Sequence, residues 1–338
     1  MTIISRDILK KRAKIISAIR DFFNIRDFLE VETPTLVKCP GMEPYLNPFE
    51  TVLWDEQGHE FPAYLTTSPE YAMKKLLAGG LEKIYCLGKV FRNNEPLGGT
   101  HNPEFTMIEW YRIKADYFDV MKDVEEMVFE VARVLGLGPQ INYAGRTIDL
   151  MPPWTRLSMR AAWQKYADVN LDDFLDRGKM IMLAREKGYD AKDDDTFDDA
   201  FFRIFLTEIE PALSIGERPV FLYDYPVQMA ALSEKCVQDP HYAQRFEVYV
   251  GGMELGNAFT ELRDADEQER RLREEQDLRR ALGKKVFEID RDFLNALRSG
   301  FPPTGGIAFG VDRLVMLLLN KQKIDEVIFN STGELFGA

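Results

Sequence analysis

The chain has 338 residues, of which 45% are hydrophobic and 29% charged, and its formal net charge is -13. This length suits one large domain or two modest ones, and the composition is that of a soluble globular protein. A broad nucleic-acid surface normally carries an excess of basic residues, so a large polyanion is disfavoured as the main partner.

The cysteines and the apolar runs narrow the class of protein further. Cys39, Cys86 and Cys236 lie far apart and form no Cys-x-x-Cys pair, which disfavours a zinc site or a disulfide framework. The N-terminal segment has no apolar signal core, and the longest apolar run, residues 314–319, is too short to span a membrane. We therefore expect a cytoplasmic protein that makes no membrane contact.

The first part of the chain predicts a helix, two short strands and a second helix. Apolar residues recur at helical spacing among charged residues over 5–28, which indicates an amphipathic helix. Residues 28–34 have the pattern of a strand ended by proline, and residues 58–67 contain another short strand. Ser68 is expected to cap the next helix, with Pro69 at its first position.

Residues 91–113 predict a strand, a loop and a second strand. One face of the second strand carries Phe105, Met107, Glu109 and Tyr111, and the other carries Thr106, Ile108, Trp110 and Arg112. A strand face that mixes a carboxylate and a phenol with apolar groups is typical of a polar pocket. The alternative is an edge strand with one hydrated face.

The rest of the chain alternates helical segments with a hairpin. Helices are expected over 117–136, over most of the acidic segment 160–215, over 264–282 and over 314–320, and a hairpin over 246–258. The acidic run near residue 193 is interpreted as a solvated surface. Because the strands are consecutive rather than alternating with helices, we expect an α+β fold with a mainly antiparallel sheet flanked by helices.

The hairpin carries a candidate metal site. With Gly251-Gly252 as the turn, Tyr249 faces Glu254, and Glu247 shares their side of the sheet. Two carboxylates on one face suit a shared divalent cation, and ligation by oxygen alone indicates Mg²⁺. The alternative is that each carboxylate pairs with a lysine or arginine.

The residues after the hairpin turn raise a question of register. Strict alternation places Asn257, Phe259 and Glu261 on the opposite face from Glu254. These side chains reach the same pocket only if the strand bulges, and Gly256 is the natural position for a bulge.

Two arginines are isolated cations in apolar surroundings. Arg92 follows Val-Phe, and Arg313 lies within Gly-Val-Asp-Arg-Leu-Val. Planar guanidinium groups suit phosphate, so both are candidate nucleotide contacts. The alternative is a buried ion pair, for example of Arg313 with Asp312 or Glu109. The chain contains neither a Walker-type loop nor a Gly-x-Gly-x-x-Gly sequence, so nucleotide chemistry would require another scaffold.

Together these segments resemble the class II aminoacyl-tRNA synthetases of the lysyl type. Residues 28–34, 91–111 and 305–313 are similar to motifs 1, 2 and 3 of that family, and residues 67–70 and 254–261 to its substrate segments. The resemblance spans nearly the whole chain in the family's order. It implies a class II catalytic domain, expected here as a single domain over 1–338 with a helical acidic insertion at roughly 160–215.

Within this family the chain resembles most the elongation factor P–(R)-β-lysine ligases. The motif 1 segment begins near residue 28, which leaves no room before it for the family's anticodon-binding domain. Ala308 stands where the lysyl-tRNA synthetases carry glycine and the ligases carry alanine. A methyl group there would crowd the α-amino side of lysine, whereas a β-amino acid places its amine elsewhere.

The resemblance also implies roles for individual residues. Arg92 and Arg313 would be the catalytic cations, and Glu247 and Glu254 the Mg²⁺ ligands. ATP would be bound by Arg92, Asn94, Glu95, Asn102, Phe105, Glu254, Leu255, Gly310 and Arg313, where either Asn94 or Glu95 replaces the family's loop glutamate. The amino acid would be bound by Ser68, Pro69, Glu70, Glu109, Tyr111, Asn257, Glu261 and Ala308.

These roles lead to an expected function. The chain would adenylate (R)-β-lysine or lysine with ATP and Mg²⁺ and transfer it to a lysine of elongation factor P, as a homodimer that does not bind tRNA. One alternative is a lysine-activating synthetase core that still charges tRNA. Another is a catalytically silent, synthetase-like binding protein.

Overall fold

The computed structural model describes residues 4–337, and the chain divides into two compact units. The first unit comprises the chain up to Ala115 and from Glu261 onward, and the second comprises Asp116–Thr260. Both are described in turn below. The single catalytic domain expected over the whole chain stays a prediction.

The first unit is organised around four hydrogen-bonded strands. In spatial order these are β1 (Leu29–Glu30), β5 (Lys83–Phe91), β6 (Glu104–Ile113) and β13 (Thr304–Gly310). β1 runs parallel to β5, whereas β5–β6 and β6–β13 are antiparallel. The predominance of antiparallel pairing agrees with the sequence prediction.

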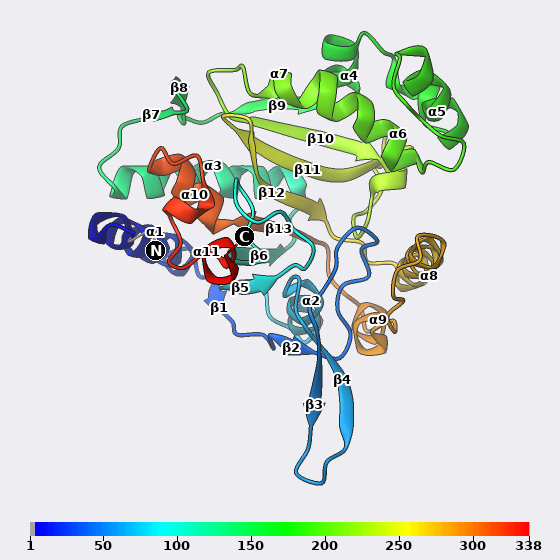
Figure 1. The fold of residues 1–338 in the computed structure, drawn as a ribbon, viewed down its shortest axis with the longest axis horizontal. Helices are drawn as coiled ribbons and strands as arrows, with labels where there is room; N and C mark the ends of the chain where they lie inside the picture. Colours follow the sequence, from blue (N-terminus) through cyan, green and yellow to red (C-terminus); the bar gives the residue numbers. More distant parts are fainter. Residues whose placement is uncertain (1–3, 338) are drawn as a thin grey trace. The chain divides into compact units, whose positions relative to one another are not determined.

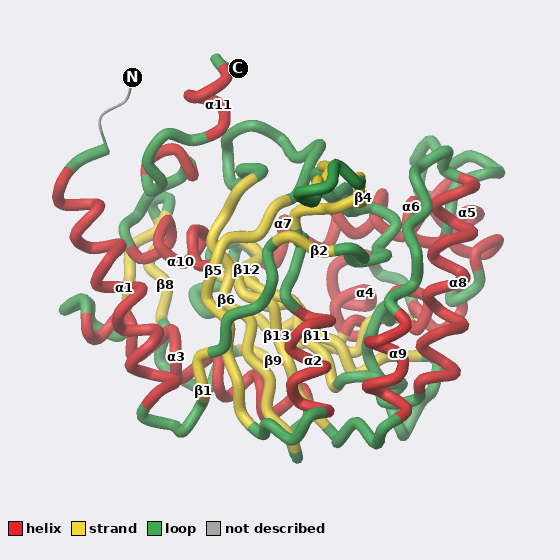
Figure 2. The backbone as a smooth tube through the Cα atoms, turned by 90° about the horizontal axis from the view of Figure 1, so that it is seen from below, coloured by secondary structure: helices red, strands yellow, loops and turns green. Residues whose placement is uncertain are grey.

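Two helices cover one face of these strands. They are α1 (Arg6–Asn24) and α10 (Val311–Leu318), which lie at one flank of β5 and β6 in Figures 1 and 2. The ring of Phe23 in α1 packs against Tyr85 and Trp110, with centroids 5.1 and 5.0 Å apart. The apolar stripe predicted for residues 5–28 is therefore buried against this sheet.

The opposite face is covered by α2 (Glu70–Ala78), α8 (Ala265–Ala281) and α9 (Arg291–Arg298), at the other flank in both views. Tyr71 of α2 stacks on Phe293 of α9 with centroids 4.4 Å apart. Apolar residues from α2, α8 and α9 form one buried core with Ile84 of β5 and Tyr111 of β6.

The two faces of β6 follow the predicted alternation. Tyr111 joins the core under α2 and α9, whereas Trp110 packs on α1. Thr106 also points to the α1 side, where its hydroxyl accepts a hydrogen bond of 2.9 Å from Arg12. The mixed face that carries Glu109 thus looks toward α2 and is not a hydrated edge.

Smaller elements complete the first unit. β2 (Leu36–Val37), β4 (Glu60–Leu65) and β3 (Glu50–Trp54) form a separate three-stranded sheet in that order. The β3–β4 hairpin projects from the remainder of the unit in Figure 1. The tail forms the 3-10 turn η4 (Ile324–Glu326) and α11 (Thr332–Phe336).

The second unit contains four further strands. In spatial order they are β12 (Met253–Thr260), β11 (Tyr242–Val250), β10 (Val220–Pro226) and β9 (Thr155–Ser158). β11 is antiparallel to both β12 and β10, and β9 runs parallel to β10. Gly251 and Gly252 form the β11–β12 turn with φ of 61° and 84°, as the two-residue glycine turn predicted.

The helices of the second unit lie mainly between β8 and β10 in the chain. α3 (Tyr117–Val134) is fixed at its start by a capping box of Asp116 and Asp119. The other elements are β7 (Gln140–Tyr143), β8 (Arg146–Asp149), α4 (Met159–Ala167), η1 (Leu171–Phe174), α5 (Arg177–Glu186), α6 (Phe197–Ile204), the π-helical η2 (Phe205–Ile209), α7 (Glu210–Leu213) and η3 (Val227–Met229).

The acidic segment 160–215 is more than a solvated surface. Its helices enclose an aromatic core, in which Trp163 and Phe201 lie 4.8 Å apart, and this core packs against β10. Within the acidic run, Asp193 is fully exposed, but Asp195 is mostly buried and pairs with Arg203 at 2.9 Å. The prediction of a solvated run holds for Asp193 and is wrong for Asp195.

A buried ion pair links the N-terminal helix to α10. Arg12 Nη1 lies 2.6 Å from Asp312 Oδ1, with side chains 14% and 2% exposed, and Asp312 Oδ2 accepts the Thr106 N–H at 2.7 Å. The Asp312 carboxylate is thus engaged by Arg12 and by the Thr106 backbone. Asp312 holds α1, β6 and α10 together.

We expect Asp312→Asn to lower the free energy of unfolding by about 3 kcal/mol, because it leaves the Arg12 charge buried without its partner. Urea denaturation measures this loss. Asp7→Asn is the matched control, since its pair with Lys11 is exposed and contributes at most about 0.5 kcal/mol. Equal effects of the two substitutions would contradict the role of Asp312.

Candidate active site

Three carboxylates of the first unit converge beside the start of α2. Glu70 is the first residue of α2, Glu109 is central in β6, and Glu261 donates its N–H to the Thr304 carbonyl at 2.9 Å. Glu109 and Glu261 are fully buried, Glu70 raises the pKa of both, and Glu109 also raises that of Glu261. The structure brings these three predicted site residues together, and their role in binding an amino acid stays a prediction.

Glu109 is held by two hydroxyl groups. Ser68 Oγ donates to Glu109 Oε1 at 2.6 Å, and Tyr111 OH donates to Oε2 at 2.8 Å. Ser68 Oγ also accepts the Glu70 N–H at 3.0 Å, but Pro69 occupies the capping position and Glu70 begins α2, so the predicted start of this helix is wrong by one residue. One serine therefore fixes both the helix start and a pocket carboxylate.

Gly306 forms the floor between Tyr111 and Glu261. It lies opposite Tyr111 in the β6–β13 register, and a Cβ at this position would lie 2.2 Å from the Tyr111 ring and 2.5 Å from Glu261 Oε1. Real Cβ atoms do not make contacts this short, so only glycine lets the phenol and the carboxylate approach. Ala308 lies opposite Glu109 in the same register and is half-buried.

Lys74 closes this group from α2. Its Nζ lies 2.6 Å from Glu70 Oε1 and 2.5 Å from Glu261 Oε2, and its side chain is 0% exposed. Burial lowers the pKa of Lys74, but the carboxylates of Glu261 and Glu70 outweigh burial and raise it. The lysine is therefore a permanent cation in the pocket.

Burial raises the pKa values of two pocket carboxylates, Glu109 and Glu261. It raises the pKa of Glu109 to about 8, helped by the charge of Glu70 and opposed by the hydrogen bonds from Ser68 and Tyr111. Burial likewise raises the pKa of Glu261 to about 8, against the attraction of Lys74. An incoming cation would favour the ionised forms, so the pocket is suited to ammonium groups.

A second group in the first unit is cationic. Arg92 lies at the end of β5 with its guanidinium 5.2 Å from the Phe105 ring centroid, and its Nε is buried without a partner. Arg313 donates to the Thr100 carbonyl at 3.3 Å and to His101 Nε2 at 3.0 Å. Since arginine has no acceptor, the His101 nitrogen must accept this bond.

His101 is neutral in this arrangement. Burial, and then the charge of Arg313, lowers its pKa below the usual value. Glu95 opposes that shift, so the Glu95 carboxylate lies near the imidazole. Asn94 has a φ of 60° in an exposed turn, where its N–H bonds to its neighbour's side chain. This contrast favours Glu95 over Asn94 as the loop residue that meets a nucleotide.

The C-terminal tail packs on the motif 2 segment. Asn102 Oδ1 accepts the Thr332 N–H of α11 at 2.9 Å, and the Asn102 amide donates to the Glu104 carbonyl at 2.5 Å. The Ile324 N–H donates to the Gly99 carbonyl at 2.7 Å. Asn102 is thus partly engaged by the tail, and Gly310, another expected nucleotide contact, caps α10.

In the second unit, the hairpin has a bulge at Leu255. Tyr249 lies opposite Glu254 as expected, but the next pairs are Val248 with Gly256 and Glu247 with Asn257. Leu255 is the extra residue, one position before the glycine that the sequence indicated. The bulge returns Asn257 to the face of Glu254, so of the two alternatives left open by the sequence, the bulge is present and strict alternation does not hold.

Glu247 is engaged by its neighbours on that face. Its Oε1 accepts from Arg245 Nη2 at 2.6 Å, and its Oε2 accepts from Tyr249 OH at 2.7 Å. Arg245 also donates to Asn257 Oδ1 at 3.2 Å. The carboxylates of Glu247 and Glu254 offer the oxygen ligands that Mg²⁺ prefers. Arg245, which already binds the Glu247 carboxylate, would compete with the metal ion there.

No group of three or more acidic, histidine or cysteine side chains among residues 4–337 is arranged as a metal cage. Mg²⁺ usually takes one or two carboxylates and completes its octahedron with water and phosphate oxygens. The donor set of Glu247 and Glu254 therefore fits a magnesium ion that arrives with a nucleotide.

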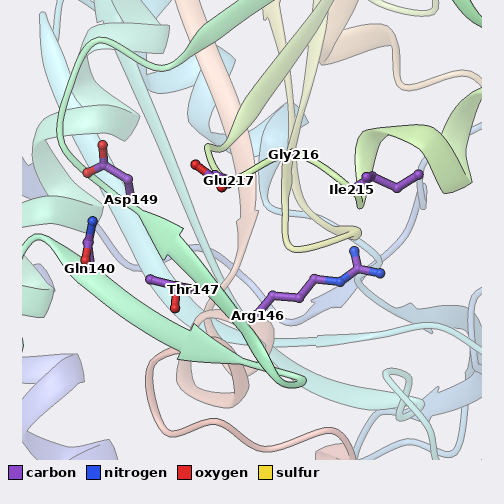
Figure 3. Close-up of a pocket in the computed structure, with 7 residues that line it drawn as sticks. All are labelled: Gln140, Arg146, Thr147, Asp149, Ile215, Gly216 and Glu217. Carbon is purple, nitrogen blue, oxygen red and sulfur yellow. The ribbon is translucent and has the colours of Figure 1, made fainter.

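A separate polar pocket lies in the second unit (Figure 3). It is lined by residues of the β7–β8 hairpin, including Arg146 and Asp149, and by residues 215–217. None of these is an expected site residue, so this pocket adds nothing to the chemistry above.

No helix in the described part of the chain combines the length and apolar character needed to cross a bilayer.

Comparison with known proteins defines the class. Residues 3–332 match the family of class II tRNA synthetases (D, K and N), and the chain belongs to this family. The sheet and flanking helices above are accordingly those of a class II synthetase catalytic domain.

The curated relatives that the chain matches include several lysine–tRNA ligases. The chain is 41% identical over 328 residues to a lysine–tRNA ligase of Dehalococcoides mccartyi, and 39% and 38% identical to those of Moorella thermoacetica and Chloroflexus aurantiacus. The matches cover 95–96% of this chain and 64% of each relative.

Four residues that shape the site were not expected from the sequence. They are Lys74, His101, Arg245 and Gly306. Lys74 follows Glu70 by four positions on a helix, which is the spacing of an ordinary surface pair. Gly306 lies opposite Tyr111, and that pairing requires the β6–β13 register, which the sequence alone does not provide.

The raised pKa of Glu109 predicts a pH-dependent stability. In the unfolded chain the carboxyl ionises near 4.5, but in the folded protein it stays protonated up to about 8. The free energy of unfolding should therefore fall as pH rises between these values. We expect Glu109→Gln to reduce this fall, as measured by urea denaturation across that range.

The control is Glu104→Gln on the exposed end of the same strand, which should keep the wild-type slope. A Glu109→Gln protein with an unchanged pH dependence would show that this carboxyl is already ionised in the folded state.

Proposed function

We propose that this protein is an ATP-dependent ligase that adenylates a diamino acid, lysine or (R)-β-lysine, and transfers it to an acceptor amine. The observation that carries the proposal is the pair of buried carboxylates Glu109 and Glu261, with Glu70 partly buried beside them, in a chain whose relatives are lysine–tRNA ligases. Such a pocket is costly to bury unless cations enter it.

Charge accounting supports a substrate with two ammonium groups. With all three carboxylates ionised in the substrate complex, the pocket would carry three negative charges, of which Lys74 neutralises one. Two ammonium groups would complete the balance. We assign the backbone amine to Ser68, Glu70 and Glu109, and the side-chain ammonium to Tyr111 and Glu261, with Asn257 as a further contact.

The cationic group suits the nucleotide. We assign Arg92 to the α-phosphate, Phe105 to the adenine ring, and Arg313, oriented by His101, to the other side of the nucleotide. Glu95, Asn102, Leu255 and Gly310 are further proposed ATP contacts. Glu247 and Glu254 would hold Mg²⁺, which would neutralise phosphate charge.

The chemistry needs no protein nucleophile. The substrate carboxylate attacks the α-phosphorus of ATP in line, an oxygen–phosphorus bond forms, and pyrophosphate leaves. Arg92 stabilises the charge that develops on the α-phosphate oxygens, and the pocket carboxylates fix the orientation of the attacking group. Catalysis is thus positioning together with charge neutralisation.

For the acceptor, we propose a lysine of elongation factor P. Ala308 favours this choice, because its methyl group lies opposite Glu109, where the α-amine of lysine would bind. The net charge of -13 also disfavours tRNA. A second candidate is charging of tRNA with lysine, which the names of the relatives favour.

We further propose a homodimer. Ile25, Leu29 and Leu36, in and beside the motif 1 segment, are 74%, 54% and 43% exposed. Exposed apolar side chains in this segment would be covered in a self-complementary interface between two copies of the chain.

Pyrophosphate exchange tests the adenylation step. The wild type should exchange pyrophosphate into ATP only when lysine or (R)-β-lysine is present. Glu254→Gln should lower the rate by about 10²–10³, since it removes one charge-stabilising group. The control, Glu217→Gln, alters an exposed glutamate and should retain the wild-type rate. Full activity in EDTA, or in Glu254→Gln, would overturn the metal assignment.

Substrate choice is tested at Ala308. The wild type should prefer (R)-β-lysine, and Ala308→Gly should raise kcat/KM for L-lysine and narrow the preference. One methyl group changes discrimination by about 10–200-fold at most. If the wild type prefers L-lysine, or if the ratio is unchanged in Ala308→Gly, Ala308 does not select the substrate and the tRNA-charging candidate gains support.

A further inference from the structure

Lys74 of α2 forms ion pairs with two of the pocket carboxylates. Its Nζ contacts Glu70 and Glu261 at 2.6 and 2.5 Å, and none of its side chain is exposed. The ammonium also lies 5.8 Å from the centroid of the Phe293 ring of α9. Complete burial means that solvent screens these contacts very little.

The two oxygens of Glu261 have different surroundings. Oε2 faces Lys74, whereas Oε1 is buried without a hydrogen-bond partner and lies over Gly306, beside the Tyr111 ring. An unpaired buried carboxylate oxygen is costly, so it marks a position where a donor is missing. The lysine therefore occupies one side of the carboxylate and leaves the other side open.

The next residue along the helix provides a contrast. Lys75 pairs with Asp290 at 2.5 Å, but its side chain is 35% exposed and it faces α9, away from Glu261. Adjacent lysines on α2 thus make ion pairs of equal length in different surroundings. Only that of Lys74 includes a pocket carboxylate.

We propose that Lys74 is a positioning residue for the amino-acid substrate: it favours the ionised form of Glu261 and fixes that carboxylate through Oε2, so that Oε1 receives the side-chain ammonium of the diamino acid. This inference rests on the proposed function, and it adds a residue that acts on the substrate through Glu261. Lys74 should stay paired with Glu261 when the substrate binds, because its buried ammonium cannot turn out into water.

A neutral residue at position 74 would change the titration of Glu261. The groups that face Glu261 are Lys74 and Glu70 from α2, and Glu109 and Tyr111 from β6. Removal of the Lys74 cation leaves burial and the acidic neighbours Glu70 and Glu109, all of which raise the pKa of Glu261. Loss of an adjacent opposite charge typically shifts a pKa by about 1–3 units.

The expected kinetic result follows from the sign of this shift. In Lys74→Met, the acidic limb of kcat/KM for the diamino acid should move to higher pH by about 1–3 units. Near neutral pH the KM for the amino acid should rise about 10-fold or more, and the deficit should shrink as pH rises. The KM for ATP should stay unchanged, since Lys74 touches none of the assigned nucleotide residues.

Pyrophosphate exchange as a function of pH tests the inference, with Lys74→Met, Lys74→Arg and Lys75→Met compared to the wild type. Lys74→Arg should restore most of the pH profile because it keeps the charge. Lys75→Met should behave as the wild type in KM and pH dependence. Circular dichroism confirms that each variant is folded.

The outcomes separate this inference from the proposed function. If the wild type shows no exchange with either diamino acid, the proposed function fails. If the wild type is active but Lys74→Met matches Lys75→Met in its pH limb and KM, the role of Lys74 is overturned.

Should Lys74→Met fail to fold, ¹⁵N NMR of the wild-type lysine ammonium groups decides. A Lys74 resonance that is protected from water and shifts when lysine binds supports the inference. A Lys74 ammonium that exchanges freely with water contradicts it.

Discussion

Desolvation of the carboxylates around Glu109 is the constraint on which the first unit depends. Each buried carboxylate loses hydration that no apolar packing replaces, so the fold must supply donors and cations around it. Ser68 and Tyr111 supply hydroxyls to Glu109, and Lys74 supplies a charge to Glu70 and Glu261. This compensation is incomplete, as the raised pKa of Glu109 shows. The remaining deficit is what a substrate with ammonium groups can fill.

The surrounding elements serve to keep this polar group rigid. β6 presents Glu109 and Tyr111 on one face while Trp110 anchors the other face to α1. α2 brings in Glu70 and Lys74, and its stacking on α9 through Tyr71 and Phe293 fixes its position. A site assembled from strands and a packed helix loses little entropy when ligand binds. Binding energy is then available for orienting the reacting carboxylate.

The sequence predicted those features that depend on local periodicity. The two faces of β6, the amphipathic α1 and the glycine turn of the hairpin follow from periods of 2 and 3.6 and from turn chemistry, and the structure confirms them. Features that depend on the pairing register of two strands could not be predicted in the same way. The bulge at Leu255 moves Asn257 to the other face, and alternation alone cannot reveal it.

Long-range pairing explains the remaining differences. Asp312 pairs with Arg12, 300 positions away in the chain, and no local pattern indicates that pair. Lys74 has the sequence appearance of a surface lysine, and only the approach of Glu261 makes it internal. The acidic segment 160–215 similarly hides an aromatic core that its charge composition obscures. In each case the structural role of the residue or segment depends on its tertiary contacts and cannot be read from residue type alone.

The central claim is that the buried carboxylates form a receptor for two ammonium groups. Isothermal titration calorimetry of the wild type near pH 7, repeated in buffers of different ionisation enthalpy, tests it without catalysis. Since Glu109 and Glu261 titrate at about 8, binding of lysine or (R)-β-lysine should release protons to the buffer. Norleucine, which lacks the second ammonium, should bind far more weakly. Binding of lysine without proton release, and of norleucine with equal affinity, would contradict the account.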